Sequence, residues 1–133
     1  MALTMLDKQP VKAEKAAWPP EIVAEFEREK QNPNGCVGQR LLSENDRVRI
    51  WELRLPPGVR GPVHRHELDH ILIQLDGDRV AVHPEPDTSG PYAEYLEADV
   101  SRGNVIYVTR GGVEAAHNIG KRSYHEIIVE LKD

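Results

Sequence analysis

The stretch "PPGVRGPVHRHELDH", residues 56–70, decides the fold because it holds three of the six histidines of the chain, His64, His66 and His70. On a β-strand, side chains two residues apart project from the same face, roughly 6.5 Å from each other. His64 and His66 can therefore aim their imidazoles at one point. His70 has the same parity and can join them if the chain bends in between. Neutral imidazole binds zinc, copper, iron and nickel, so the spacing predicts a metal site; the alternative is a solvated, mildly basic strand end.

Composition bounds the class of protein. The chain has 133 residues, which suits one domain, and its 17 basic and 22 acidic side chains give a net charge of −5. Nucleic-acid binding needs a basic surface, so no nucleic-acid partner is expected. No run of 18 apolar residues and no secretory signal is visible, and Cys36 is the one cysteine. We expect a cytoplasmic protein with no membrane partner and a small-molecule ligand.

The pattern along the chain predicts one helix followed by many short strands. Residues 1–17 show little apolar periodicity and are expected to be poorly ordered. Two prolines and Glu21 favour a helix start, and the apolar spacing predicts a short amphipathic helix over 21–30. From residue 35 the apolar pattern has period two, with about eight strands separated by turns, among them a hairpin turn at "DGD", residues 76–78. This pattern predicts an all-β sandwich or barrel.

The residues around the histidines follow a longer spaced pattern. Gly58 is followed by five residues and then by His64-Arg65-His66; His70 comes three residues later, and Gly77 six residues after that. The pattern resembles the first motif of the cupin superfamily, which is a glycine, five residues, His-x-His, three or four residues, a glutamate, six residues and a glycine. His70 stands where the family has its glutamate ligand.

A second spaced pattern lies downstream in the order that the resemblance requires. From Gly103, five residues lead to Thr-Arg-Gly at 109–111, two more to Glu114 and three more to Asn118. The second cupin motif is a glycine, five residues, Pro-x-Gly, two residues, a histidine, three residues and an asparagine. Thr109 replaces the proline, and Glu114 stands at the position of the histidine ligand.

The two motifs cover residues 58–120, and "RSYHEIIVELKD" at the end of the chain resembles the last strand of small single-domain cupins. The resemblance implies an RmlC-like jelly-roll barrel, an antiparallel double-stranded β-helix. We therefore expect a barrel over residues 35–133 and an N-terminal extension with a short helix over 1–34.

The resemblance also implies a ligand set. Cupins usually hold a metal with three histidines and one glutamate, and His64, His66, His70 and Glu114 keep that composition with two roles exchanged. A one-residue bulge in "GGVEAAHN" would turn His117 inward instead, so Glu114 and His117 remain alternatives for the fourth ligand. A third reading is a decayed site without metal.

Two further expectations concern the strand "HILIQL". Gln74 shares the inward parity and is a candidate substrate-pocket residue, or a satisfied interior polar group. Ile71 and Ile73 form the opposite, apolar face, which needs a cover from the N-terminal helix or from a second subunit. We expect a homodimer because this face exceeds what one short helix covers.

The expected function is metal binding in a barrel cavity. One divalent transition metal ion per chain, iron, zinc, nickel or manganese, would make the protein a mononuclear metalloenzyme that acts on a small organic molecule, of the oxygenase or the isomerase or decarboxylase type. The alternative is a non-catalytic, small-molecule-binding cupin with a degenerate metal site. No motif names a substrate or a catalytic residue.

Overall fold

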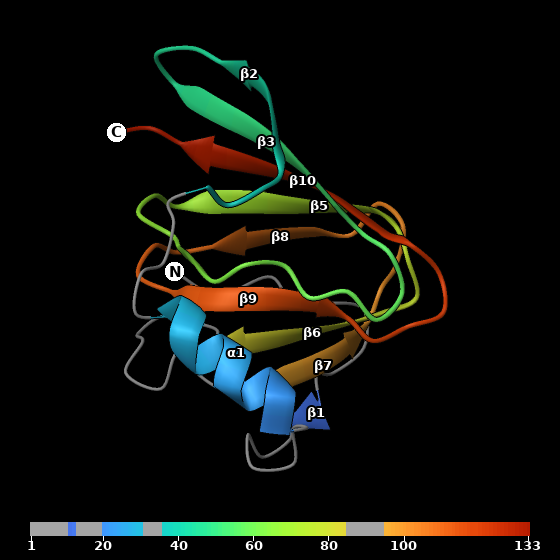
Figure 1. Cartoon of the computed structure of the whole chain (residues 1–133). Coiled ribbons are helices and arrows are strands. Elements are labelled where there is room, and N and C mark those ends of the chain that lie inside the picture. The colour runs from blue at the N-terminus through green and yellow to red at the C-terminus, as the bar shows by residue number, and fades with distance from the viewer. Residues whose placement is uncertain (1–10, 13–19, 31–35, 85–94) are drawn as a thin grey trace.

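The protein is built from two five-stranded antiparallel sheets that face one another (Figure 1). The computed structural model describes residues 11–12, 20–30, 36–84 and 95–133. The elements in chain order are β1 (Val11–Lys12), α1 (Pro20–Lys30), β2 (Arg40–Glu44), β3 (Val48–Leu55), β4 (His64–Arg65), β5 (His70–Asp76), β6 (Arg79–Pro84), β7 (Leu96–Asp99), β8 (Val105–Val108), β9 (Val113–Asn118) and β10 (Tyr124–Leu131).

The chain crosses repeatedly between the two sheets. The first sheet has the order β1-β7-β6-β9-β4, and the second has the order β2-β3-β10-β5-β8. The predicted all-β architecture is confirmed. The expectation of poor order over residues 1–17 is wrong for residues 11–12, which form β1 and pair with β7; the rest of that segment lies outside the described residues.

The "DGD" turn connects the sheets and does not close a hairpin. The predicted hairpin is wrong because β5 pairs with β10 and β8 on its two edges, while β6 pairs with β7 and β9. Gly77 has a φ of +132°, a conformation that glycine tolerates best. A period-two pattern predicts which face of a strand is buried, but it does not predict which other strand lies beside it in the sheet.

The core lies between the inner faces of the two sheets. Along β10, buried and partly buried residues alternate, so that Tyr124 and Ile128 face inward. Leu53 and Leu55 of β3 are buried in the same cluster.

The helix covers the outer face of the first sheet (Figure 1). The prediction of a helix over 21–30 is confirmed, and Val23 packs against a buried cluster of Val63, Val113 and Ala115. The apolar side of β5 belongs to the second sheet and receives no cover from α1 within the described chain. In that same part of the chain, no helix is long and apolar enough to cross a membrane.

Candidate metal centre and cavity

Three potential metal ligands meet where β4 pairs with β9. The strand register sets His64 directly opposite Glu114. The Nε2 atom of His66 lies 3.0 Å from His64 Nε2 and 3.0 Å from Glu114 Oε1. The ligand atoms of all three residues lie within 4.8 Å of one another, and all three residues are buried.

Backbone contacts hold the two histidines in place. His64 Nδ1 lies 3.1 Å from the carbonyl oxygen of Pro62. A carbonyl can only accept, so Nδ1 carries the proton and the lone pair of Nε2 faces the other ligands. Past the end of β4, the amide of His66 donates to Gly112 O at 2.8 Å, and its carbonyl accepts from the amide of Gly111 at 2.9 Å.

His70 lies beside this cluster, with its ring stacked on that of His66. The two ring centroids are 3.9 Å apart, and the rings are 10° from parallel. His70 Nδ1 donates to the carbonyl oxygen of Leu68 at 3.1 Å. Its Nε2 is buried without a hydrogen-bond partner in the described chain, as is His66 Nδ1. The structure therefore brings His70 next to the site, while its nitrogens stay outside the cluster of three ligand atoms.

Glu114 and His117 lie on opposite faces of β9. The strand runs without a bulge opposite β6, so residues 114 and 117 have opposite parity. His117 faces away from the cavity, with its Nδ1 3.1 Å from His83 Nε2 and its Nε2 3.3 Å from the carbonyl of Gly58. Of the two alternatives for the fourth ligand, the structure places only Glu114 with His64 and His66.

Burial keeps the three histidines neutral at physiological pH. Desolvation lowers the pKa of His64, of His66 and of His70 to about 4. Metal ligation requires neutral imidazole, so these rings do not have to release a proton before they bind a metal ion. Burial raises the pKa of Glu114, which a bound cation would reverse.

The cluster forms one end of a cavity of about 60 Å³ between the sheets, enough for several water molecules. Its walls are mainly apolar. The apolar residues that line it are Val37, Leu53, Leu72, Val80, Val82, Leu96, Ala98, Ile106, Ala116 and Ile128.

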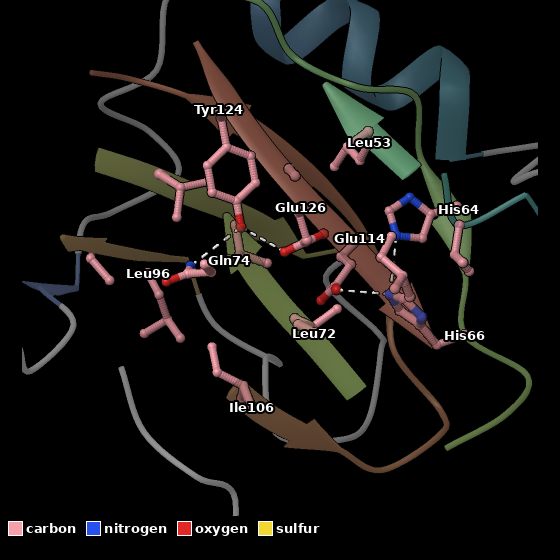
Figure 2. Close-up of a pocket in the computed structure, with 16 residues that line it drawn as sticks. Leu53, His64, His66, Leu72, Gln74, Leu96, Ile106, Glu114, Tyr124 and Glu126 are labelled. Atoms are coloured by element: carbon pink, nitrogen blue, oxygen red, sulfur yellow. Dashed lines mark hydrogen bonds and ion pairs between the residues drawn. The ribbon is translucent and has the colours of Figure 1, made fainter. Parts of the chain in front are cut away.

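Gln74 lies at the other end of the cavity, with two residues that the motifs did not indicate (Figure 2). Gln74 Nε2 donates to Tyr124 Oη at 3.3 Å, and the Tyr124 hydroxyl donates to Glu126 Oε1 at 2.6 Å. The sequence "RSYHEIIVELKD" contains a pattern that could have indicated Tyr124 and Glu126. Tyr124, Glu126 and Ile128 share one parity of that strand, which places an acidic residue on its core-facing side.

The described chain directs no lysine or arginine side chain into this cavity. Arg49, on the inward parity of β3, donates through Nε to Glu130 Oε1 at 2.7 Å, and Trp51 Nε1 donates to the same oxygen at 2.6 Å. Arg54 is exposed and lies near Glu52. The acidic groups among the described residues that line the cavity are the carboxyls of Glu114 and Glu126.

Comparison with known proteins establishes the fold. No protein-family model matches the chain, and no curated protein matches it. A cupin domain from Bordetella pertussis Tohama I is similar in structure, with a TM-score of 0.61 and 19% sequence identity over 77% of this chain and 98% of that one. An RmlC-like cupin family protein with a double-stranded β-helix fold, from Methanocaldococcus jannaschii, has a TM-score of 0.56 and 22% identity over 70% and 77% of the two chains.

The DMSP lyase DddQ from Ruegeria pomeroyi is also similar, with a TM-score of 0.50 and 18% identity over 67% of this chain and 40% of that one. At these identities the similarity concerns the fold. The chain has the cupin fold, an antiparallel double-stranded β-helix with a short N-terminal helix, as the two motifs implied.

Proposed function

We propose that the protein binds one divalent transition metal ion per chain through His64, His66 and Glu114, and that it acts as a mononuclear metalloenzyme on a small organic molecule. The observation that carries this proposal is the convergence of two imidazole nitrogens and one carboxylate oxygen at one end of a buried cavity.

The donor atoms fit such an ion. Two ligand atoms that are each about 2.1 Å from one ion and at a right angle to each other lie about 3.0 Å apart. That is the spacing of His66 Nε2 from His64 Nε2 and from Glu114 Oε1. The tautomer of His64 already directs its lone pair to this point. Two histidines and one carboxylate, with positions left for substrate, are typical of oxygen-activating iron sites, although zinc, nickel and manganese also bind such donors.

When bound, the ion would supply a Lewis acid for isomerisation or decarboxylation, or an iron centre for oxygen chemistry. The chain supplies the surroundings. Apolar walls exclude water from the ligand, and His70 packs its ring on His66 and keeps that imidazole in position. The buried Nε2 of His70 has no hydrogen-bond partner among the described residues, so His70 stays a candidate for a further ligand.

The test is the metal content of purified variants. His64→Ala and Glu114→Ala each remove one donor, so we expect bound metal per chain to fall by far more than tenfold after loading and removal of excess. His125→Ala is the matched control, because His125 pairs with Glu52 on the outer face of the second sheet. His117→Ala should also retain metal, because its ring contacts His83 and faces away from the cavity.

Equal metal retention in His64→Ala and His125→Ala would contradict the proposed site. That result would favour the second candidate, a non-catalytic small-molecule-binding protein whose metal site has degenerated. The cavity supports this alternative equally well, because its apolar lining does not depend on a metal. A lyase among the proteins of similar fold supports the enzyme.

We further propose that the protein is a homodimer, formed through the apolar outer face of the second sheet. Ile71, Ile73 and Val105 lie on this face, and α1 packs on the other sheet. Its location in the cytoplasm stays a prediction from the sequence.

A further inference from the structure

The end of the cavity opposite the histidines contains a carboxyl group that the metal site does not use. Glu126 is only 6% exposed and lines the cavity from β10. Its Oε1 accepts a hydrogen bond from the Tyr124 hydroxyl, which in turn accepts from the Gln74 amide. Gln74 is itself fixed, since its Oε1 lies 3.4 Å from the backbone amide of Ser101 and 3.4 Å from Asn104 Nδ2.

This chain of hydrogen bonds orients the carboxyl and leaves half of it unused. Tyr124 has one hydroxyl proton, and it donates that proton in a hydrogen bond to Glu126 Oε1. The other oxygen, Oε2, has no hydrogen-bond partner among the described residues, and it is not closed off from the cavity. Figure 2 shows the carboxyl groups of Glu126 and Glu114 turned into the space between the Tyr124 end and the His66 end.

The cavity has no positive charge of its own to balance this carboxylate. Among the described residues that line it there is no lysine or arginine. The neighbouring acid on the same strand, Glu130, differs because Arg49 and Trp51 both donate to it. A buried carboxylate without a cation is costly, so it either stays protonated or receives a cation from outside the chain. At the histidine end that cation is the proposed metal ion.

At the far end, we infer that a ligand supplies the cation: the cavity binds a small organic molecule that bears a protonated amine, with the ammonium group on Glu126 Oε2 and the apolar part against the cavity walls. This inference rests on the proposed function, because it names the class of substrate for the same cavity. Tyr124 adds an aromatic ring to the lining, a surface that attracts organic cations. Two carboxyls in the lining would repel an anionic molecule unless the metal held it.

The experiment uses three probes of similar size and different charge: n-propylammonium, 1-propanol and propionate. Each is titrated into ¹⁵N-labelled full-length protein, once after metal removal by chelation and once after loading with zinc. The readout is the side-chain amide of Gln74, which lies next to Tyr124 and reports on this end of the cavity. We expect n-propylammonium to shift this resonance with saturation, and 1-propanol to bind at least tenfold more weakly. Propionate should leave it unchanged in the metal-free protein.

Variants then assign the effect to Glu126. Glu126→Gln keeps the size and removes the charge, so the affinity for n-propylammonium should fall at least tenfold. Glu52→Gln is the control, because Glu52 is on β3 of the same sheet but on its outer face, with His125. The comparison of the three probes on the unchanged protein remains decisive if Glu126→Gln does not fold.

The outcomes separate this inference from the proposed function. In the metal-free protein, propionate or 1-propanol binding as tightly as n-propylammonium would overturn the inference, as would unchanged amine binding in Glu126→Gln. Metal content is measured on the same samples. Glu126-dependent amine binding by a protein that retains no zinc would refute the metal site and leave a cation-binding protein.

Discussion

Glu126 connects the chemistry of the cavity with the stability of the fold, because it is a carboxyl group held away from water. Burial raises its pKa from 4.5 to about 7, and the hydrogen bond from Tyr124 only partly opposes this. In the absence of a cationic ligand, the folded chain therefore holds this proton at a pH at which the unfolded chain has released it. Glu126 therefore lowers the free energy of unfolding at neutral pH.

A Glu126→Gln variant should show how large that cost is. The pKa of Glu126 is higher in the folded than in the unfolded chain. Its contribution to the free energy of unfolding is therefore fully present below pH 4.5 and is lost as the pH rises to 7. Relative to the variant, wild-type protein should lose about 3 kcal/mol of unfolding free energy over that range. Urea unfolding of chelator-treated protein at pH 5 and pH 8 measures the difference.

Glu67→Gln is the control for this measurement, because Glu67 is exposed. This variant should have the same pH dependence of unfolding free energy as the wild type. If Glu126→Gln and wild type change in parallel between pH 5 and pH 8, Glu126 does not carry a raised pKa in the folded protein.

Local spacing was enough to predict some of these residues but not others. His64 and His66 were predictable because both lie at one strand end, where parity alone brings their side chains together. Glu114 and His117 stayed alternatives because a single bulge would exchange their faces, and its absence from β9 shows only in the pairing with β6. Glu126 was missed because the resemblance assigns no ligand to the last strand.

Among the elements, α1 bears most directly on the site, although the sequence motifs assign it no function. Glu29 of α1 accepts from Arg60 Nη2 at 2.8 Å and from Arg60 Nη1 at 3.2 Å, and also from the backbone amide of Val63 at 2.9 Å. Val63 directly precedes His64. The Arg60 side chain is only 4% exposed and that of Glu29 is 26% exposed, so this ion pair is partly shielded from water and fixes the segment that leads into β4.

Glu29→Gln should therefore weaken the metal site as well as the fold. The amide cannot replace a carboxylate that accepts from both guanidinium nitrogens and from an amide, so we expect a loss of about 1–3 kcal/mol in unfolding free energy. Metal affinity should fall about tenfold, the lower end of the effect of residues that orient ligands. Competition with a chelator measures that affinity.

Glu21→Gln in the first turn of the same helix is the matched control, since Glu21 is exposed. A Glu29→Gln protein that is less stable but binds metal as tightly as Glu21→Gln would show that the helix supports the fold alone.

The pairing of strands was less accessible from the sequence than the strands themselves. Turn residues at 76–78 suggested a hairpin because such turns commonly join neighbours in one sheet. In this fold β5 and β6 lie in different sheets, and that choice depends on contacts between segments distant in the chain. The two cupin motifs provided this long-range information, which propensity and periodicity lack.

At the scale of the molecule, the outer face of the second sheet is an apolar surface that no described element covers. Ile71 and Ile73 of β5 lie opposite Tyr107 and Val105 of β8 on this face. Ile127 of β10 pairs with Ile73 on its other side. These residues are only partly buried in the single chain, and Val105 is 48% exposed. An apolar surface that spans neighbouring strands is typical of a surface that binds another protein.

Sedimentation should find a dimer of twice the 15.0 kDa chain mass at micromolar concentration. Val105→Glu places a charge at the proposed contact, where burial without a partner is costly, and should shift the protein to monomer. Val59→Glu is the matched control, because Val59 is 41% exposed in the loop before β4, where its carbonyl accepts from the amide of Asn118 in the first sheet. A wild-type monomer, or a Val105→Glu dimer as stable as the Val59→Glu dimer, would contradict this assignment. A monomer would also mean that the isoleucines of β5 remain in contact with water, which makes the surface a candidate for another partner.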